Sequence, residues 1–232
     1  MLIFWDIDGT LLTTNRAGIF GWEEAVRDLT GRSVDLDRFE TAGHPDHGIA
    51  RRLLADYGGP TAPTAPQVAE LVRRYEDHLP AALTRRTGRV LPNVREILER
   101  LAGEPAVCSL LLTGNTRRGA LTKLGHYGLL DFFSDGGFSE GDADRATIAR
   151  AALARAVGAG CPVQPDRIYV VGDTPHDLRC ASAIDARAIA VATGQHTLAE
   201  LAALAPWRAL AQLPAPGLFL ALLDGREALA DA

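Results

Sequence analysis

The sequence lacks the features of a membrane or secreted protein. Its 232 residues contain no run approaching the ~20 apolar residues that a transmembrane helix needs. The N-terminus has no basic region followed by an apolar stretch, as a signal peptide would. No basic block is present and the net charge is −5, whereas nucleic-acid backbones call for clustered lysine and arginine. We therefore expect a cytoplasmic protein that binds neither a membrane nor nucleic acid.

Cysteine and lysine are also scarce. The three cysteines, Cys108, Cys161 and Cys180, form no CxxC pair and are odd in number. This pattern is typical of a reducing compartment and argues against a zinc site, so we expect no disulfide framework. Lysine occurs once, as Lys123, against 23 arginines. Any reaction that requires a lysine therefore has a single candidate.

Apolar runs typical of buried strands alternate with helical patterns over much of the chain. The expected strands are Leu2–Trp5, Val107–Thr113, Phe133–Phe138, Arg167–Gly172, Arg187–Ala192 and Trp207–Leu213. The expected helices are Val94–Leu101, Arg118–Tyr127, Arg145–Val157 and His176–Ala183. This alternation predicts an α/β fold with a parallel sheet covered on both faces, whose ligands bind beyond the carboxyl ends of the strands.

Residues 14–89 break the alternation and show helical patterns only, at Ala17–Thr30, Pro45–Tyr57 and Pro66–Arg85. The length allows a core domain with a smaller inserted one. We therefore predict a core formed by residues 1–13 and 90–232 and a helical cap formed by residues 14–89. The last segment, Pro216–Ala232, is either a packing helix or an interface.

Two acids follow the first strand in the string Asp6-Ile7-Asp8-Gly9-Thr10-Leu11-Leu12. Side chains two apart in a strand share a face, so both carboxylates can reach one point. Buried carboxylates repel each other unless a cation is bound beside them. Gly9 and Thr10 add a tight turn whose backbone can approach an anion closely. The string predicts a site for a divalent metal and a phosphate, and the alternative is an ordinary Asp-Gly turn with solvated acids.

Two later strands also end in polar residues. Asp173 and Asp177 follow Ile168–Gly172 and can share one face of a helix that begins at Thr174 or Pro175. Thr113, followed by Gly114 and Asn115, ends another apolar run. A hydroxyl with exposed N–H groups at a strand-to-helix turn suits a phosphoryl group. In both places the alternative is simple capping of the following helix.

These motifs, in this order, resemble those of the haloacid dehalogenase (HAD) superfamily, and most closely its helical-capped, phosphoglycolate phosphatase-like members. The resemblance implies a Rossmann-like core with an inserted helical cap, and a Mg²⁺-dependent phosphatase that forms an aspartyl-phosphate. Asp6 would be the nucleophile, Asp8 the general acid and base, and Thr113 a ligand of the phosphoryl oxygens. Four residues would hold the metal: Asp6, Asp8 through its backbone carbonyl, Asp173 and Asp177. The expected substrate-binding residues are Gly9, Thr10, Gly43, His44, Gly114 and Asn115.

The chain departs from the family pattern at the third motif, which is normally a lysine. Residues 139–147 contain no lysine, and Arg145 is the best-placed cation. Arginine can neutralise the site but donates its hydrogen bonds with a different geometry. The alternative is that Arg145 pairs with Asp142 or Asp144 on the surface. Lys123 is kept as a weaker candidate, because its position suits packing or a solvated face.

The segment Thr41-Ala42-Gly43-His44-Pro45-Asp46 joins two helical stretches. It resembles the specificity loop of helical-capped members, in which His44 and Asp46 would reach the leaving group, and the alternative is an ordinary Gly-Pro turn. Hinges between the cap and the core are expected near Leu12–Asn15 and Gly88–Pro92. Arg16, next to the first of them, is placed to meet an anionic substrate. The other histidines are interpreted as surface or packing residues: His47, His78, His126, His176 and His196.

Rival reactions of the family can be compared on the residues. A dehalogenase needs no acid two residues after its nucleophile, so Asp8 favours phosphate chemistry. A phosphonatase needs a cap lysine, and residues 14–89 contain none. A phosphomutase and a non-catalytic binding protein stay open. The expected substrate is a small phosphomonoester such as phosphoglycolate or a sugar phosphate, and the chain is expected to be a monomer or a homodimer.

Overall fold

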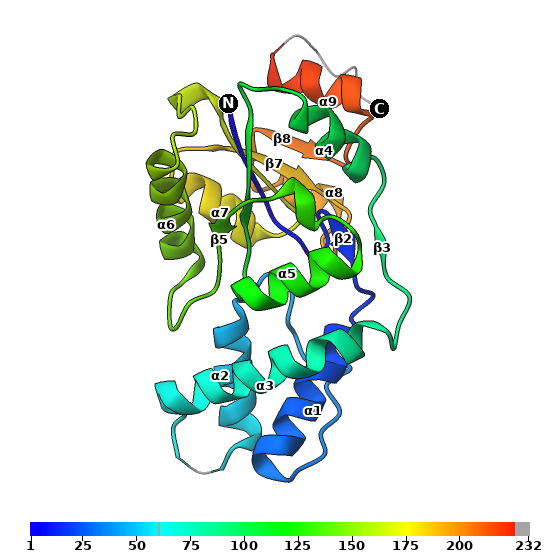
Figure 1. The fold of residues 1–232 in the computed structure, drawn as a ribbon, viewed down its shortest axis with the longest axis vertical. Helices are drawn as coiled ribbons and strands as arrows, with labels where there is room; N and C mark the ends of the chain where they lie inside the picture. The colour runs from blue at the N-terminus through cyan, green and yellow to red at the C-terminus, as the bar shows by residue number, and fades with distance from the viewer. Residues whose placement is uncertain (60, 226–232) are drawn as a thin grey trace.

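Six parallel strands form the central sheet in the computed structural model, which describes residues 1–59 and 61–225 (Figure 1). The strands are β1 (Leu2–Trp5), β4 (Cys108–Leu112), β5 (Gly136–Gly137), β6 (Ile168–Gly172), β7 (Arg187–Val191) and β8 (Arg208–Leu210), in the spatial order β5-β4-β1-β6-β7-β8. β1 pairs with β4 on one side and with β6 on the other. The direction of strand addition reverses beside β1, and ligands of open α/β sheets bind at such a point.

The alternation of side chains along β1 explains why both faces of the sheet are covered. Ile3 and Trp5 pack towards α4 (Val94–Ala102), α5 (Arg117–His126) and α9 (Pro216–Leu223). Leu2 and Phe4 pack towards α6 (Arg145–Gly158) and α7 (Pro175–Ala183). All four side chains are fully buried, as expected of a parallel strand covered on both faces. The predicted α/β fold is confirmed, and α9 shows that the described part of the last segment packs on the core.

The cap consists of α1 (Gly18–Thr30), α2 (Asp46–Tyr57) and α3 (Ala65–Leu83), which lie beyond the sheet at one end of the molecule (Figure 1). They enclose a separate hydrophobic cluster, in which the rings of Trp22 and Tyr75 stack with centroids 3.8 Å apart.

A short antiparallel pair, β2 (Leu12–Thr13) and β3 (Arg89–Val90), lies where the chain leaves and re-enters the core. This position supports the predicted division into residues 14–89 and the rest, which stays a prediction. The remaining elements are the short helices η1 (Leu130–Phe132), η2 (Pro165–Arg167) and α8 (Leu198–Ala202). Across residues 1–59 and 61–225, none of the helices has the length and apolarity needed to cross a bilayer.

A disulfide joins Cys108 to Cys161, so the expectation that the chain has no disulfide was wrong. Cys108 begins β4, and Cys161 lies just after α6. The two cysteines are 53 positions apart in sequence, and their Cα atoms are 5.8 Å apart. α6 packs along the sheet and returns the chain to the amino end of β4, a proximity that spacing in the sequence does not reveal. Cys180 is free and buried. The cysteine pattern therefore no longer supports a reducing compartment.

We predict that removing this cross-link destabilises the core. In the chain-entropy model, a closed loop of about 50 residues is worth about 4 kcal/mol. A Cys108→Ala/Cys161→Ala variant should therefore have a free energy of unfolding lower by up to about 4 kcal/mol, measured by urea denaturation. Reductant should destabilise the wild-type protein and leave the double variant unchanged. Equal transitions for the wild-type protein with and without reductant would contradict the prediction.

Candidate active site

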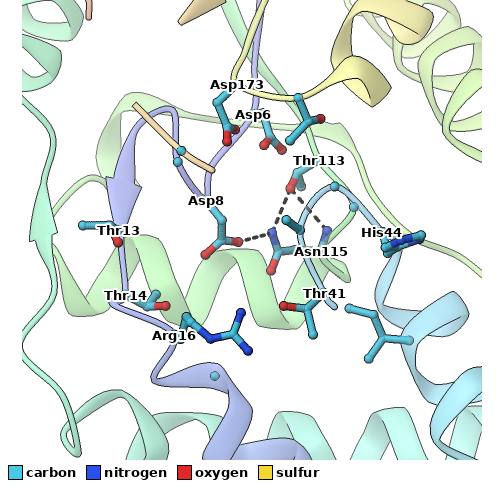
Figure 2. Close-up of a pocket in the computed structure, with 18 of the residues that line it drawn as sticks. Asp6, Asp8, Thr13, Thr14, Arg16, Thr41, His44, Thr113, Asn115 and Asp173 are labelled. Carbon is cyan, nitrogen blue, oxygen red and sulfur yellow. Dashed lines mark hydrogen bonds between the residues drawn. The ribbon is translucent and has the colours of Figure 1, made fainter. Parts of the chain in front are cut away.

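A cavity of about 320 Å³ lies between the carboxyl ends of the sheet strands and the cap (Figure 2). It brings together most of the residues that the sequence singles out: Asp6, Asp8, Gly9, Gly43, His44, Thr113, Gly114, Asn115, Arg145 and Asp173. Thr10 and Asp177 lie buried just behind this lining. These residues come from loops after β1, β4 and β6, from the start of α6 and from the cap.

Three buried aspartates form an acidic cluster at the sheet end of the cavity. Oxygen atoms of Asp6, Asp173 and Asp177 lie within 4.8 Å of one another. Burial, followed by the charge of Asp177, raises the pKa of Asp6 to about 7. Burial and the charges of Asp177 and Asp6 likewise raise the pKa of Asp173 well above its ordinary value. Like charges in this setting favour either a retained proton or a bound cation.

The surroundings of Asp173 fit a hard divalent cation. Its carboxylate accepts one hydrogen bond, from the Thr10 hydroxyl at 3.2 Å, and leaves other lone pairs for a metal. Two glycines form a cradle around it: a Cβ would lie 2.4 Å from Asp173 Oδ2 at Gly9 and 1.7 Å from it at Gly194. The donors are all oxygen atoms, which Mg²⁺ prefers.

Asp177 is committed largely to protein partners. One of its oxygens pairs with Arg145. The other accepts from the Thr174 backbone N–H at 3.0 Å and the Thr174 hydroxyl at 2.7 Å. This arrangement closes the first turn of α7 as a capping box. Asp177 therefore orients Arg145 and contributes its charge to the cluster, and a water-mediated contact to a metal is the arrangement these bonds allow.

Arg145 lies inside the site, at the start of α6. Its side chain is 5% exposed, pairs with Asp177 and has Nη2 3.9 Å from Asp6 Oδ1. The surface alternative does not match the structure, because Asp142 pairs with Arg51 and Asp144 caps α6. The structure thus places a cation where the sequence shows no lysine.

Lys123 also lies inside the site, so its interpretation as a packing or solvated residue was wrong. Its ammonium donates to Asp8 Oδ2 at 2.5 Å and to Asn115 Oδ1 at 2.6 Å. Although burial opposes the charge, Asp8 and Asp46 raise the pKa of Lys123 above its ordinary value. The face of α5 that carries Lys123 is turned towards the cavity. The only sign of this role in the sequence was that the chain has a single lysine.

Asn115 links the phosphoryl-binding turn to Asp8. Its side-chain amide donates to Thr113 Oγ1 at 2.8 Å and to Asp8 Oδ2 at 2.9 Å (Figure 2). Asp8 therefore accepts from both Asn115 and Lys123, on the side of the cavity away from the three buried acids. The two aspartates of the first motif therefore have different electrostatic surroundings: Asp6 lies among acids, and Asp8 lies beside a cation and an amide.

The cap loop reaches into the core, which favours the specificity-loop interpretation. Gly43 has φ +69° and lies so close to α7 that a Cβ would sit 2.6 Å from His176 Cδ2. The rings of His44 and His176 have centroids 5.2 Å apart. Burial, helped by Arg179, lowers the pKa of His176 to about 4, and burial also lowers the pKa of His44. Both rings are therefore neutral at pH 7.

Asp46, the first residue of α2, bonds the cap to the turn after β4. Its backbone N–H donates to Gly114 O at 2.8 Å, and its Oδ2 accepts from the Thr116 N–H at 2.7 Å. Burial raises the pKa of Asp46 to about 7, against an opposing effect of Lys123. Sequence reasoning placed Asp46 at the leaving group, and the structure adds that its side chain faces the core backbone.

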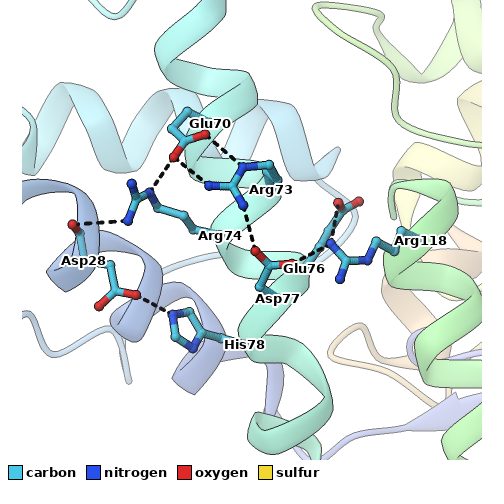
Figure 3. A network of polar contacts seen from close by, with 8 residues as sticks. All are labelled: Asp28, Glu70, Arg73, Arg74, Glu76, Asp77, His78 and Arg118. Carbon is cyan, nitrogen blue, oxygen red and sulfur yellow. Dashed lines mark hydrogen bonds and ion pairs between the residues drawn. The ribbon is translucent and has the colours of Figure 1, made fainter.

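A surface network also links α3 of the cap to α5 (Figure 3). Arg118 of α5 pairs with Asp77 of α3 at 2.7 Å and approaches Glu76 at 3.7 Å. The side chains of Arg118 and Asp77 are about half exposed (54% and 45%), and exposed ion pairs contribute only about 0–1 kcal/mol. The buried bonds of Asp46 therefore matter more for holding the cap.

We predict that Asp46 makes stability depend on pH. Its folded pKa of about 7 exceeds that of an unfolded aspartate, so between these values the folded state holds a proton that the unfolded state has lost. The free energy of unfolding should then fall as pH rises from about 4 to about 7, by at most about 1.4 kcal/mol per pH unit from this group. Asp46→Asn, which keeps an acceptor for Thr116, should show a shallower slope in urea denaturation at pH 4.5, 6 and 8. Parallel slopes for the two proteins would refute this role.

Comparisons with known proteins agree with this fold and identify the family. The family model of the haloacid dehalogenase-like hydrolases matches residues 3–182. No curated protein matches the sequence. Among solved structures, a predicted phosphoglycolate phosphatase from Haemophilus somnus is 19% identical over 97% of both chains, with a TM-score of 0.69. A predicted phosphatase from Clostridium acetobutylicum is 16% identical, with 96% of this chain and 98% of that chain covered and a TM-score of 0.70. A candidate β-phosphoglucomutase from Thermotoga maritima is 20% identical, with coverages of 97% and 98% and a TM-score of 0.58.

Proposed function

Because the chain belongs to the haloacid dehalogenase-like hydrolases, we propose that it is a Mg²⁺-dependent phosphatase of small phosphomonoesters that works through an aspartyl-phosphate. Its solved neighbours include proteins named as phosphatases, which supports a phosphoric monoester hydrolase. One observation carries the proposal. Asp6 and Asp8 lie two residues apart, yet Asp6 belongs to the acidic cluster beside Arg145 and Asp8 is held by Asn115 and Lys123.

Asp6 is the proposed nucleophile. Its carboxylate attacks phosphorus and forms an acyl-phosphate bond as the bond to the leaving oxygen breaks. The Arg145 guanidinium, 3.9 Å from Asp6, and the Thr113 hydroxyl are placed to stabilise the phosphoryl oxygens. Mg²⁺ would be held by Asp6, the Asp8 backbone carbonyl and Asp173, with Asp177 through water. When bound, the metal supplies positive charge beside the transferred group.

Asp8 is the proposed general acid and base. It gives a proton to the leaving oxygen in the first step and takes one from the attacking water in the second. Lys123 and Asn115 hold its carboxylate from one side, at 2.5 and 2.9 Å. A fixed orientation matters because proton transfer requires hydrogen-bond distance to the leaving oxygen.

The cavity favours a small leaving group. Its volume of about 320 Å³ is near the lower end of ligand sites. Its cap side includes four apolar or aromatic residues: Ile19, Trp22, Ile49 and Tyr75. A short phosphomonoester such as phosphoglycolate or a sugar phosphate suits these dimensions.

A phosphomutase is the second candidate, because one solved neighbour is named as a β-phosphoglucomutase. Such an enzyme would share Asp6 and Asp8 but return the phosphoryl group to its substrate. Product analysis separates the two, since a phosphatase releases inorganic phosphate and a mutase yields an isomeric phosphate.

We predict magnesium-dependent release of phosphate that requires Asp6. Phosphate release should be measured with 2-phosphoglycolate, sugar phosphates, nucleoside monophosphates and 4-nitrophenyl phosphate, in Mg²⁺ and in EDTA. Asp6→Asn should lower kcat at least about a thousandfold, because it removes the nucleophile. Asp142→Asn, an exposed acid paired with Arg51, is the control and should keep wild-type activity. Turnover that survives both EDTA and Asp6→Asn would refute the mechanism.

We also predict that Lys123 acts through Asp8. Lys123→Met frees one side of the Asp8 carboxylate, so proton donation to the leaving group should suffer. General acid–base catalysis is typically worth about 10²–10⁴-fold. The loss in kcat should therefore approach a hundredfold for an alkyl phosphate and be much smaller for 4-nitrophenyl phosphate, whose leaving group needs no proton. An equal loss on both substrates would mean that Lys123 only supports folding.

A further inference from the structure

The hinge between β2 and α1 holds an unusual backbone. Asn15 and Arg16 are consecutive non-glycine residues with positive φ, at 50° and 63°. Residues other than glycine rarely adopt this left-handed backbone conformation, and those that do are often found at ligand-binding sites. The turn directs Arg16 into the cavity, at the cap end, with Asp8 between it and the Asp6–Asp173 end (Figure 2).

Arg16 differs from the other two cations that line the cavity. Lys123 is paired with Asp8, and Arg145 is paired with Asp177. Arg16 forms no ion pair with any carboxylate of residues 1–59 and 61–225. Its Nη2 donates to two backbone carbonyls of the cap, Asp37 O at 2.9 Å and Phe39 O at 3.2 Å. These bonds fix the guanidinium in place without neutralising its charge.

Other donors of Arg16 remain unused. Nε is buried and has no hydrogen-bond partner among the residues described, and no partner of Nη1 occurs among them either. A guanidinium that lines a cavity and has no carboxylate partner is suited to binding an anion there. Arginine is well suited to it because its planar group matches carboxylate geometry.

We propose that Arg16 determines specificity by binding a carboxylate on the leaving group of the substrate. The phosphoryl group would lie at the acidic cluster and the carboxylate at Arg16, with the leaving oxygen beside Asp8 between them. A single guanidinium matches the single charge of a carboxylate, whereas a second phosphate group would call for more positive charge than this end of the cavity holds. The inference rests on the proposed phosphatase function and names its substrate class: short phosphomonoesters with a carboxylate.

The test compares 2-phosphoglycolate with 2-hydroxyethyl phosphate, in which a hydroxymethyl group replaces the carboxylate. A third compound, ethylene glycol bisphosphate, carries a second phosphate group in that position. Wild-type kcat/KM should favour 2-phosphoglycolate at least about tenfold over each alternative. Arg16→Gln should lose this preference, chiefly through KM for 2-phosphoglycolate, and Arg16→Lys should keep part of it. Arg38→Gln changes an exposed arginine between Asp37 and Phe39, and this matched control should keep the preference in full.

Three outcomes would overturn the proposal. In the first, Arg16→Gln lowers kcat/KM equally for all three substrates, as expected if Arg16 only braces the loop at Asp37 and Phe39. In the second, the wild-type protein prefers 2-hydroxyethyl phosphate, which has no carboxylate. In the third, it prefers the bisphosphate, which assigns the site to a second phosphate.

A binding measurement separates this inference from the proposed function. Calorimetric titration of the Asp6→Asn variant with the same three compounds reports recognition without turnover. If no substrate is hydrolysed but 2-phosphoglycolate still binds at least about tenfold more tightly than 2-hydroxyethyl phosphate, and this preference is lost in Asp6→Asn/Arg16→Gln, the role of Arg16 stands and the phosphatase function fails. If turnover occurs and no binding preference is found, the phosphatase function stands and the role of Arg16 fails.

Discussion

The mutual repulsion of carboxylates at the carboxyl ends of β1 and β6 is the constraint on which the site depends. Asp6, Asp173 and Asp177 are buried within 4.8 Å of one another, an arrangement that is costly unless positive charge compensates it. Arg145 supplies part of this charge from the start of α6, and the three carboxylates lie close enough together to hold a metal ion. The parallel sheet makes the cluster possible, because it brings the carboxyl ends of β1 and β6 to the same edge.

The cap completes this site as well as covering it. Asp46 is bonded to Gly114 and Thr116, the same turn that carries Thr113 and Asn115. Gly114 is needed there because a Cβ would lie 2.8 Å from His44 O. The closed cap therefore holds the residues proposed to bind the phosphoryl group, and positioning of this kind is a large part of catalysis in phosphoryl transfer.

Much of the fold was predictable because its signals are local. The apolar run of β1 and the acids that follow it are contiguous in sequence, and so is the strand and helix start around Asp173. Lys123 was misjudged because the weak amphipathic pattern of α5 does not show which face meets the cavity. The contact of Cys108 with Cys161 and the cradle formed by Gly194 depend on how distant segments pack, and no periodicity records this.

The bonds between Asp46 and the turn after β4 have a consequence for how such proteins diversify. Exchanging the helical cap for a different one would look like a simple way to change substrate preference. Here the exchange would remove one half of a hydrogen-bonded joint and leave Gly114 O and the Thr116 N–H without their partners. A functional chimera of this enzyme would therefore have to carry the core turn at residues 114–116 along with its cap.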